Sequence, residues 1–177
     1  KPMEEYFLSI IHSLFLGLIS FFYLLEMIDD EAWGLMSGIS LGYVLFESKR
    51  CLNDSDYVMI LHHFIMCLSL LAPYIIYFDF LYIPKIQYIL ARIFICEISN
   101  FFLWIAALMY KYKKTDNIIF KSFSLISLVS YFILRVVNFT DMLIYFYNNN
   151  IFISFYLMIP VLMMNCHWFY LLAKRTI

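Results

Sequence analysis

Two adjacent histidines, His62 and His63, lie within a run of apolar residues and are the side chains best suited to chemistry in this sequence. An imidazole can serve as a general base, a general acid, a nucleophile or a metal ligand. Neighbouring residues on a helix point about 100° apart, so both rings cannot face the same site. The pair therefore predicts one histidine that faces a site and one that packs against or hydrogen-bonds to a neighbouring helix.

Charged and amide side chains interrupt two further apolar runs. Glu97 and Asn100 are three residues apart and share one face of a helix, and Arg135 and Asn138 have the same spacing. A charge near the centre of a membrane-spanning helix costs about 2.5 to 3.5 kcal/mol. We therefore expect Glu97 to pair with either Arg135 or Arg92. The alternative is that these charges hold a lipid head group or an acyl thioester.

Polar residues from several runs lie at similar depths when they are counted from the same end of each run. Those about 7 to 10 Å deep, at 1.5 Å per helical residue, are His12, His63, Asn165 and His167. Asn100 and Glu97 lie about 15 and 20 Å deep, and Glu47 ends the second run on that side. Because helices of alternating direction have no local reason to align polar groups, we predict a shared polar cavity. The alternative for any single residue is a hydrogen bond to a neighbouring helix.

The small number of histidines limits the metal chemistry. Four histidines are too few for the two irons of a membrane desaturase, although one zinc ion held by three histidines and a carboxylate stays open. The GxSxG, Walker and HExxH motifs do not occur in the sequence. We therefore predict no metal site and no resident cofactor.

Long apolar runs must position these residues. Of 177 residues, 64% are hydrophobic and 14% are charged, so the chain has too little polar surface for a water-soluble monomer. Six runs are bounded by charged or turn residues: 6–27, 32–46, 57–78, 84–110, 118–146 and 151–172. Because a helix needs about 20 apolar residues to cross a bilayer, we predict an all-α integral membrane bundle or barrel. It would have six transmembrane helices in one domain, 1–177.

The second run is the least secure of the six. Its 15 residues would make a helix only about 22 Å long. It also contains Gly34, Gly38 and Gly42 at four-residue spacing, which removes side chains from one stripe of the helix. That stripe predicts the close approach of a neighbouring helix.

Lysine and arginine predict the orientation, because cytoplasmic loops keep positive charge. The segments on the side of the N-terminus contain Lys1, Lys49, Arg50, Lys111, Lys113, Lys114, Lys121, Lys174 and Arg175, whereas the opposite loops contain Lys85. Both termini are therefore expected in the cytoplasm, or on the matrix side in an organelle of bacterial origin. The net charge of −1 gives no basis for a nucleic-acid partner.

Four segments, in order, resemble the TLC-domain family: "DYVMILHHFIMCLSLLAPY", "ARIFICEISNFFLWIAALMY", "SYFILRVVNF" and "NCHWFYLL". This family includes the ceramide synthases, translocon-associated membrane proteins and smaller TLC-domain-containing proteins. The early segment "IHSLFLGLISFFYLL" also resembles the first helix of the smaller members. The resemblance covers nearly the whole chain, and it implies a barrel-like helical bundle with a lipid cavity.

By this resemblance, His62 and His63 match the paired histidines that ceramide synthases use in acyl transfer. The acidic motif of those enzymes is matched by Glu97, Ser99 and Asn100. The sequence departs from the family's motifs, which resemble HHxxT and HDxSD. Met66 stands where the first motif has threonine. In the second motif, Cys96 replaces the histidine, Glu97 replaces the first aspartate and Asn100 replaces the last aspartate. These departures place the chain nearer to the smaller members, whose glutamate-x-serine pattern it shares.

Together these features predict a multi-pass membrane protein that binds lipid and acts in lipid homeostasis. The reaction that the resemblance implies is acyl transfer from acyl-CoA to a lipid amine or alcohol, with His62, His63 and Glu97 as catalytic residues. The predicted lipid-binding residues are His12, Glu47, Arg92, Ser99, Asn100, Arg135, Asn138 and Asn165.

Two non-enzymatic functions stay open beside this one. The first is a non-catalytic accessory subunit of a larger membrane assembly, in which the chain's own side chains or a structural lipid fill the cavity. The second is a transport or cargo receptor. The expected partners are membrane lipids and other membrane subunits. The expected location is the endoplasmic reticulum, with the plasma membrane and the mitochondrial inner membrane as alternatives.

Overall fold

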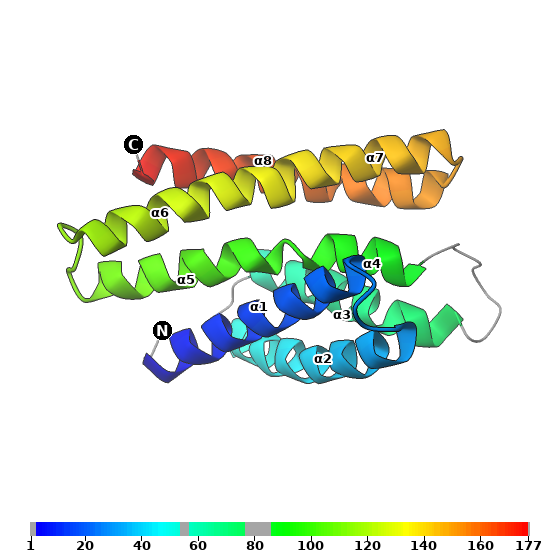
Figure 1. The fold of residues 1–177 in the computed structure, drawn as a ribbon, viewed down its shortest axis with the longest axis horizontal. Helices are drawn as coiled ribbons and strands as arrows, with labels where there is room; N and C mark the ends of the chain where they lie inside the picture. The colour runs from blue at the N-terminus through cyan, green and yellow to red at the C-terminus, as the bar shows by residue number, and fades with distance from the viewer. Residues whose placement is uncertain (1–2, 54–56, 77–85, 177) are drawn as a thin grey trace. The chain divides into compact units, whose positions relative to one another are not determined.

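The computed structural model describes residues 3–53, 57–76 and 86–176, and these residues form helices joined by short turns (Figure 1). In chain order the helices are α1 (Met3–Leu24), α2 (Asp30–Asn53), α3 (Tyr57–Ile76), α4 (Ile86–Phe94), α5 (Glu97–Lys111), α6 (Ile118–Tyr131), the π-helix η1 (Phe132–Val137), α7 (Asn138–Asn148) and α8 (Phe152–Thr176). The predicted all-α class is therefore confirmed. Two residues of the predicted charge pattern, Lys1 and Lys85, lie outside the described residues.

Within the described ranges, four helical stretches are long and apolar enough to cross a membrane. They are Met3–Leu24, Gln87–Lys111, Ile118–Asn148 and Ser154–Lys174, and they correspond to the first, fourth, fifth and sixth predicted runs. In α3 the apolar stretch, Met59–Leu68, is shorter. The composition is therefore that of an integral membrane protein, while the count of six spans and the orientation stay predictions.

Helix α2 is longer than the apolar run that predicted it. It covers 24 residues, because the polar segment after Phe46 continues the helix with good helix formers such as Glu47 and Arg50. At the other end, the carboxylate of Asp29 accepts a hydrogen bond from the backbone N–H of Ala32 at 2.8 Å and caps the helix. The run of hydrophobic residues therefore marks only the middle of this helix.

The glycine stripe of α2 predicted the close approach of a neighbouring helix. At Gly42, however, no atom of the described residues lies within 4 Å of the position that a Cβ would occupy. The predicted close packing is therefore wrong at this glycine, where a larger side chain would fit.

The chain divides into two compact units. Unit 1 consists of Lys1–Leu14 and Cys96–Ile177, and unit 2 consists of Phe15–Ile95. In unit 1, α5 packs against α6, and α8 packs against α6, η1 and α7. The prediction of a single domain stays a prediction, and each unit is described below by itself.

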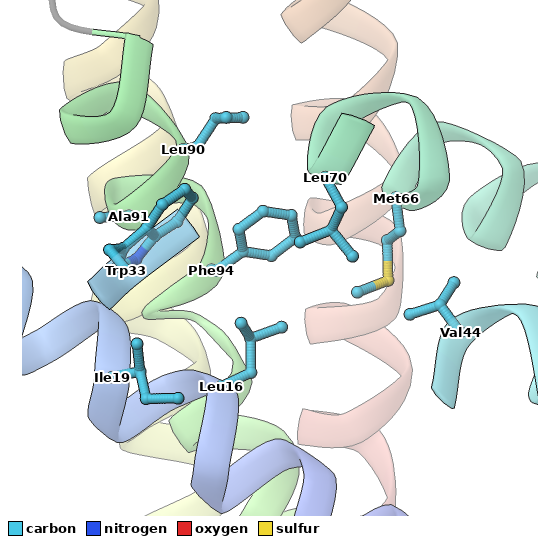
Figure 2. Packing of buried hydrophobic residues seen from close by; sticks show 9 residues of the cluster. All are labelled: Leu16, Ile19, Trp33, Val44, Met66, Leu70, Leu90, Ala91 and Phe94. Atoms are coloured by element: carbon cyan, nitrogen blue, oxygen red, sulfur yellow. The ribbon is translucent and has the colours of Figure 1, made fainter. Parts of the chain in front are cut away.

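Unit 2 has an apolar core contributed by α1, α2, α3 and α4 (Figure 2). Its buried members are Leu16, Ile19, Trp33, Val44, Met66, Leu70, Leu90, Ala91 and Phe94. Figure 2 shows the ring of Phe94 pointing toward Leu70, with Trp33 beside Ala91. Van der Waals packing of these side chains therefore holds the helices of unit 2 together.

Candidate functional site

The π-helix η1 positions the most deeply buried charge of unit 1. Ser127, Tyr131, Arg135 and Phe139 are all buried, and each is four residues from the next. In a regular α-helix, four residues turn the chain by about 400°, so a four-residue stripe drifts by about 40° at each step. The wider turns of η1, in which the backbone N–H of Asn138 bonds the carbonyl of Ile133, reduce that drift. As a result, Arg135 and Phe139 stay on the buried face.

An interruption between α4 and α5 positions a second part of the site. Helix α4 ends at Phe94 and α5 begins at Glu97, without a proline at the junction. Both the backbone N–H and the hydroxyl of Ser99 donate to the carbonyl oxygen of Cys96, at 3.0 and 2.6 Å. A serine that bonds a preceding carbonyl in this way competes with the regular helix bonds. The interruption therefore holds the Ser99 hydroxyl in a fixed, buried position at the start of α5.

Arg135 is the centre of a buried polar network in unit 1. Its side chain is 4% exposed, and each of its three guanidinium nitrogens donates a hydrogen bond. Nε bonds Ser99 Oγ at 3.1 Å, Nη1 bonds Asn165 Oδ1 at 3.0 Å, and Nη2 bonds Glu97 Oε1 at 3.5 Å. The guanidinium carbon also lies 4.9 Å from the centroid of the Tyr131 ring. One arginine thus ties η1 to both α5 and α8.

Glu97 supplies the negative charge of this network. Its Oε1 accepts from Arg135, while its Oε2 accepts from Asn100 Nδ2 at 2.9 Å and from Ser13 Oγ at 3.3 Å. The carboxylate is therefore shared between a cation and two neutral donors. Such a set of partners is what a buried carboxylate needs to remain charged.

Asn165 completes the network from α8. Its amide nitrogen donates to the carbonyl of Val161 at 2.8 Å, which turns its Oδ1 toward the interior of the unit. That oxygen accepts from both Arg135 Nη1 and Tyr131 Oη, at 3.0 and 3.1 Å. The amide orientation is thus fixed by three hydrogen bonds.

The structure brings five of the predicted site residues together. They are Glu97, Ser99, Asn100, Arg135 and Asn165, and all belong to unit 1. Of the two predicted partners of Glu97, Arg135 bonds its carboxylate within unit 1. Glu97 and Asn165, predicted at depths of about 20 Å and about 7 to 10 Å, thus meet at one junction of helices, where Arg135 bonds both of them.

Two further predicted residues belong to unit 1. His12 is buried on α1 directly before Ser13. Asn138 is half-buried and donates to the carbonyl of Leu134 on its own helix at 3.3 Å. The π-helix changes the three-residue geometry that an α-helix would give between Arg135 and Asn138.

The remaining predicted residues belong to unit 2. His63 is buried and His62 is half-buried, with ring centroids 5.7 Å apart, so the two rings have different environments as expected. Glu47 is buried and pairs with Arg50 at 2.7 Å, and Arg92 is half-buried on α4. The roles predicted for these four residues stay predictions.

Sequence reasoning missed Tyr131 and Ser13 as members of the network. Tyr131 precedes Arg135 by four residues, a spacing that places two side chains on one helix face and that would have indicated the contact. Ser13 has a weaker signal, because serine is common in apolar helices and often bonds its own backbone. The π-helix has no signal in the sequence that we could identify.

Unit 1 also contains an open pocket of about 790 Å³. It is lined by Tyr6, Leu103, Ala106, Ala107, Tyr110, Lys111, Thr115, Phe120, Ser124 and Leu172. These residues come from the start of α1, the end of α5, the following loop, the start of α6 and the end of α8. None of the predicted site residues is among them, so the pocket is a second feature of unit 1.

The network and the pocket differ in what they can do chemically. In the network, the oxygens of Glu97 and the nitrogens of Arg135 already bond groups of this chain, which suits a structural role. The pocket is lined by apolar surface, four side chains with hydroxyl groups and one ammonium group, which suits an amphipathic ligand. Among the described residues, no group of three or more histidine, cysteine, aspartate or glutamate side chains is arranged to hold a metal ion.

Comparisons with known proteins identify no family for this chain. No protein-family model matches the sequence. No curated protein is similar to it, and no solved structure is similar to its fold. The chain is therefore established as an all-helical protein with four apolar helices that are long enough to cross a membrane.

Proposed function

We propose that this chain is a multi-pass membrane protein of the TLC type that binds a lipid in the pocket of unit 1 and acts in lipid homeostasis. The single observation that carries the proposal is the pocket itself. It opens among helices that are long and apolar enough to span a bilayer. A lipid is the ligand that such a protein meets at the highest concentration.

The lining supports an amphipathic ligand. The apolar side chains of Leu103, Ala107, Phe120 and Leu172 offer a surface for an acyl chain. Ligand pockets commonly enclose about 300 to 1,000 Å³, and the volume here, about 790 Å³, lies in that range. The two small residues Ala106 and Ala107 leave the space between α5 and α6 open.

The proposal is tested by filling the pocket. Ala107→Phe places a ring in the cavity, whereas Val129→Phe adds the same ring at a position that is 50% exposed on α6. Both variants and the unchanged chain are purified in detergent, and the retained lipid is quantified by native mass spectrometry. We expect Ala107→Phe to lose most of the retained lipid and Val129→Phe to keep it.

Equal lipid retention by both variants would overturn the proposal, as would an unchanged chain that retains no lipid. Thermal unfolding of the two variants checks that Ala107→Phe is folded. If it is not, Ala107→Leu, which fills less of the cavity, gives the same comparison against Val129→Leu.

Acyl transfer is the enzymatic extension of this proposal. His62 or His63 would act as base or nucleophile on a lipid amine or alcohol, and acyl-CoA would supply the acyl group. The amine or alcohol would form an amide or ester bond as the thioester breaks and the thiol leaves. Loss of product formation in His63→Ala, with lipid retention unchanged, would support this extension.

A second candidate function is that of a non-catalytic accessory subunit, which the closed network favours. Each guanidinium nitrogen of Arg135 bonds a group of this chain, so the network holds helices together without a ligand. Purification at a fixed ratio with other membrane subunits would support it. So would unchanged behaviour of a variant in which His62 and His63 are both replaced by alanine.

A further inference from the structure

Lys111 puts a positive charge in the lining of the pocket of unit 1. The part of the lining beside Lys111 and Tyr6 is called the mouth below. Lys111 is the last residue of α5, and it is exposed. Among the described residues that line the pocket, Lys111 is the charged side chain. Its ammonium nitrogen lies 5.2 Å from the centroid of the Tyr6 ring. This cation–π contact keeps the charge beside the cavity.

The surroundings of the mouth are also basic. The exposed lysines near the ends of α5, α6 and α8 are Lys113, Lys114, Lys121 and Lys174. The acidic residues of the same ends are Glu4, Glu5 and Asp116. Together with Lys111, the lysines outnumber the acids by five to three. The field at the mouth therefore favours an anion.

These ends lie on one side of unit 1. The start of α1, the end of α5, the start of α6 and the end of α8 are found together at the left in Figure 1. If the helices of unit 1 cross the bilayer as proposed, these helix ends lie near the head groups and the helical part of the lining lies nearer the hydrocarbon. Basic residues at such a level attract anionic lipids, by about 1 kcal/mol for each lysine near the surface.

We propose that the pocket selects a phospholipid whose head group carries a net negative charge. The phosphate of the head group, whose charge no cation of the head balances, lies near Lys111, and one acyl chain follows the apolar lining. This inference rests on the proposed function, because it names the class of lipid that the pocket takes. A choline head group fits less well, because the Tyr6 ring that could hold its cation already contacts the ammonium of Lys111.

The test compares two lysines of the same segment. Lys111→Met keeps the apolar stem and removes the charge at the pocket, and Lys114→Met does the same outside the pocket lining. Each variant is reconstituted in bilayers with equal amounts of phosphatidylserine and phosphatidylcholine. It is then extracted, and both retained lipids are quantified by native mass spectrometry.

We expect the unchanged chain to retain more phosphatidylserine than phosphatidylcholine. Lys111→Met should reduce that preference about fivefold, whereas Lys114→Met should reduce it less than about twofold. Lys111→Arg keeps the charge and should keep the preference. This last variant also separates loss of charge from loss of folding.

Two results would overturn the inference. One is equal retention of both lipids by the unchanged chain, and the other is the same loss in Lys114→Met as in Lys111→Met. If Ala107→Phe still removes the lipid in either case, the lipid site of the proposed function stands and only its preference for anions is wrong. Displacement of the lipid by inorganic phosphate alone would also overturn the inference, because the site would then bind anions without a chain.

Discussion

The two units each contain a glutamate–arginine pair, and the two pairs are built differently. In unit 1, Glu97 and Arg135 are 38 residues apart, and their closest atoms are 3.5 Å from one another. In unit 2, Glu47 and Arg50 are one helical turn apart and lie at 2.7 Å. The side chain of Arg135 is 4% exposed and that of Arg50 is 19% exposed.

The shorter distance does not mark the more important pair. Arg50 lies on the same helix as its partner, so the pair stabilises one turn of α2. Arg135 instead connects η1 with α5 and α8, and loss of its charge would remove a buried cation from the carboxylate of Glu97. Burial and sequence separation, more than atomic distance, therefore decide what each pair contributes.

The largest effect is expected from Arg135→Met. This change keeps an unbranched apolar stem but removes the cation that bonds Glu97 Oε1 and one of the two donors to Asn165 Oδ1. Removal of one partner of a buried pair costs about 3 to 5 kcal/mol. The measurement is the free energy of unfolding in mixed micelles, and a loss below about 1 kcal/mol would contradict the central role of Arg135.

A double variant sharpens this result. In Glu97→Gln with Arg135→Met, neither charge is buried, and glutamine still accepts from Asn100 and Ser13. Because a neutral pair avoids the cost of an isolated charge, we expect the double variant to recover at least half of the stability lost in Arg135→Met. Additive losses would instead indicate that Glu97 and Arg135 act independently.

A smaller effect is expected from Arg50→Met in unit 2. Local pairs of this kind contribute about 0.3 to 0.5 kcal/mol, and partly exposed pairs at most about 1 kcal/mol. The measurement is the same unfolding experiment. A loss as large as that of Arg135→Met would show that burial of Glu47, rather than the separation of the partners, decides the cost.

The sequence was sufficient to predict that Glu97 needs a cation. Its position inside an apolar run and the cost of burying a lone charge give that result without coordinates. The sequence could not choose between Arg92 and Arg135, because the choice depends on which helices pack together. It also could not place Arg135 on the face of Tyr131, since that depends on η1, a local change in helix type that apolar periodicity does not reveal.

The limits of the apolar pattern show in α2 and at the start of α5. Hydrophobic residues predict where a helix meets lipid, so the polar end of α2, with Glu47 and Arg50, was not expected to continue the helix. At Cys96, the hydroxyl of Ser99 bonds a carbonyl inside what the sequence presents as one apolar run. Side-chain bonds to the backbone are decided by local geometry, which composition does not contain.

A loss well below that of Arg135→Met is also expected from Tyr131→Phe, which removes a single hydroxyl from the network. Tyr131 Oη donates to Asn165 Oδ1 at 3.1 Å, and that oxygen keeps its bond to Arg135 Nη1, so no buried acceptor is left without a partner. The ring also keeps its contact with the guanidinium group. We therefore expect a loss of about 0.5 to 1.5 kcal/mol in the free energy of unfolding. Tyr147→Phe, at a tyrosine that is 61% exposed, is the matched control and should change stability by less than about 0.5 kcal/mol. If Tyr131→Phe destabilised the chain as much as Arg135→Met, the hydroxyl rather than the charge would be the centre of the network, and the comparison between the two pairs would lose its basis.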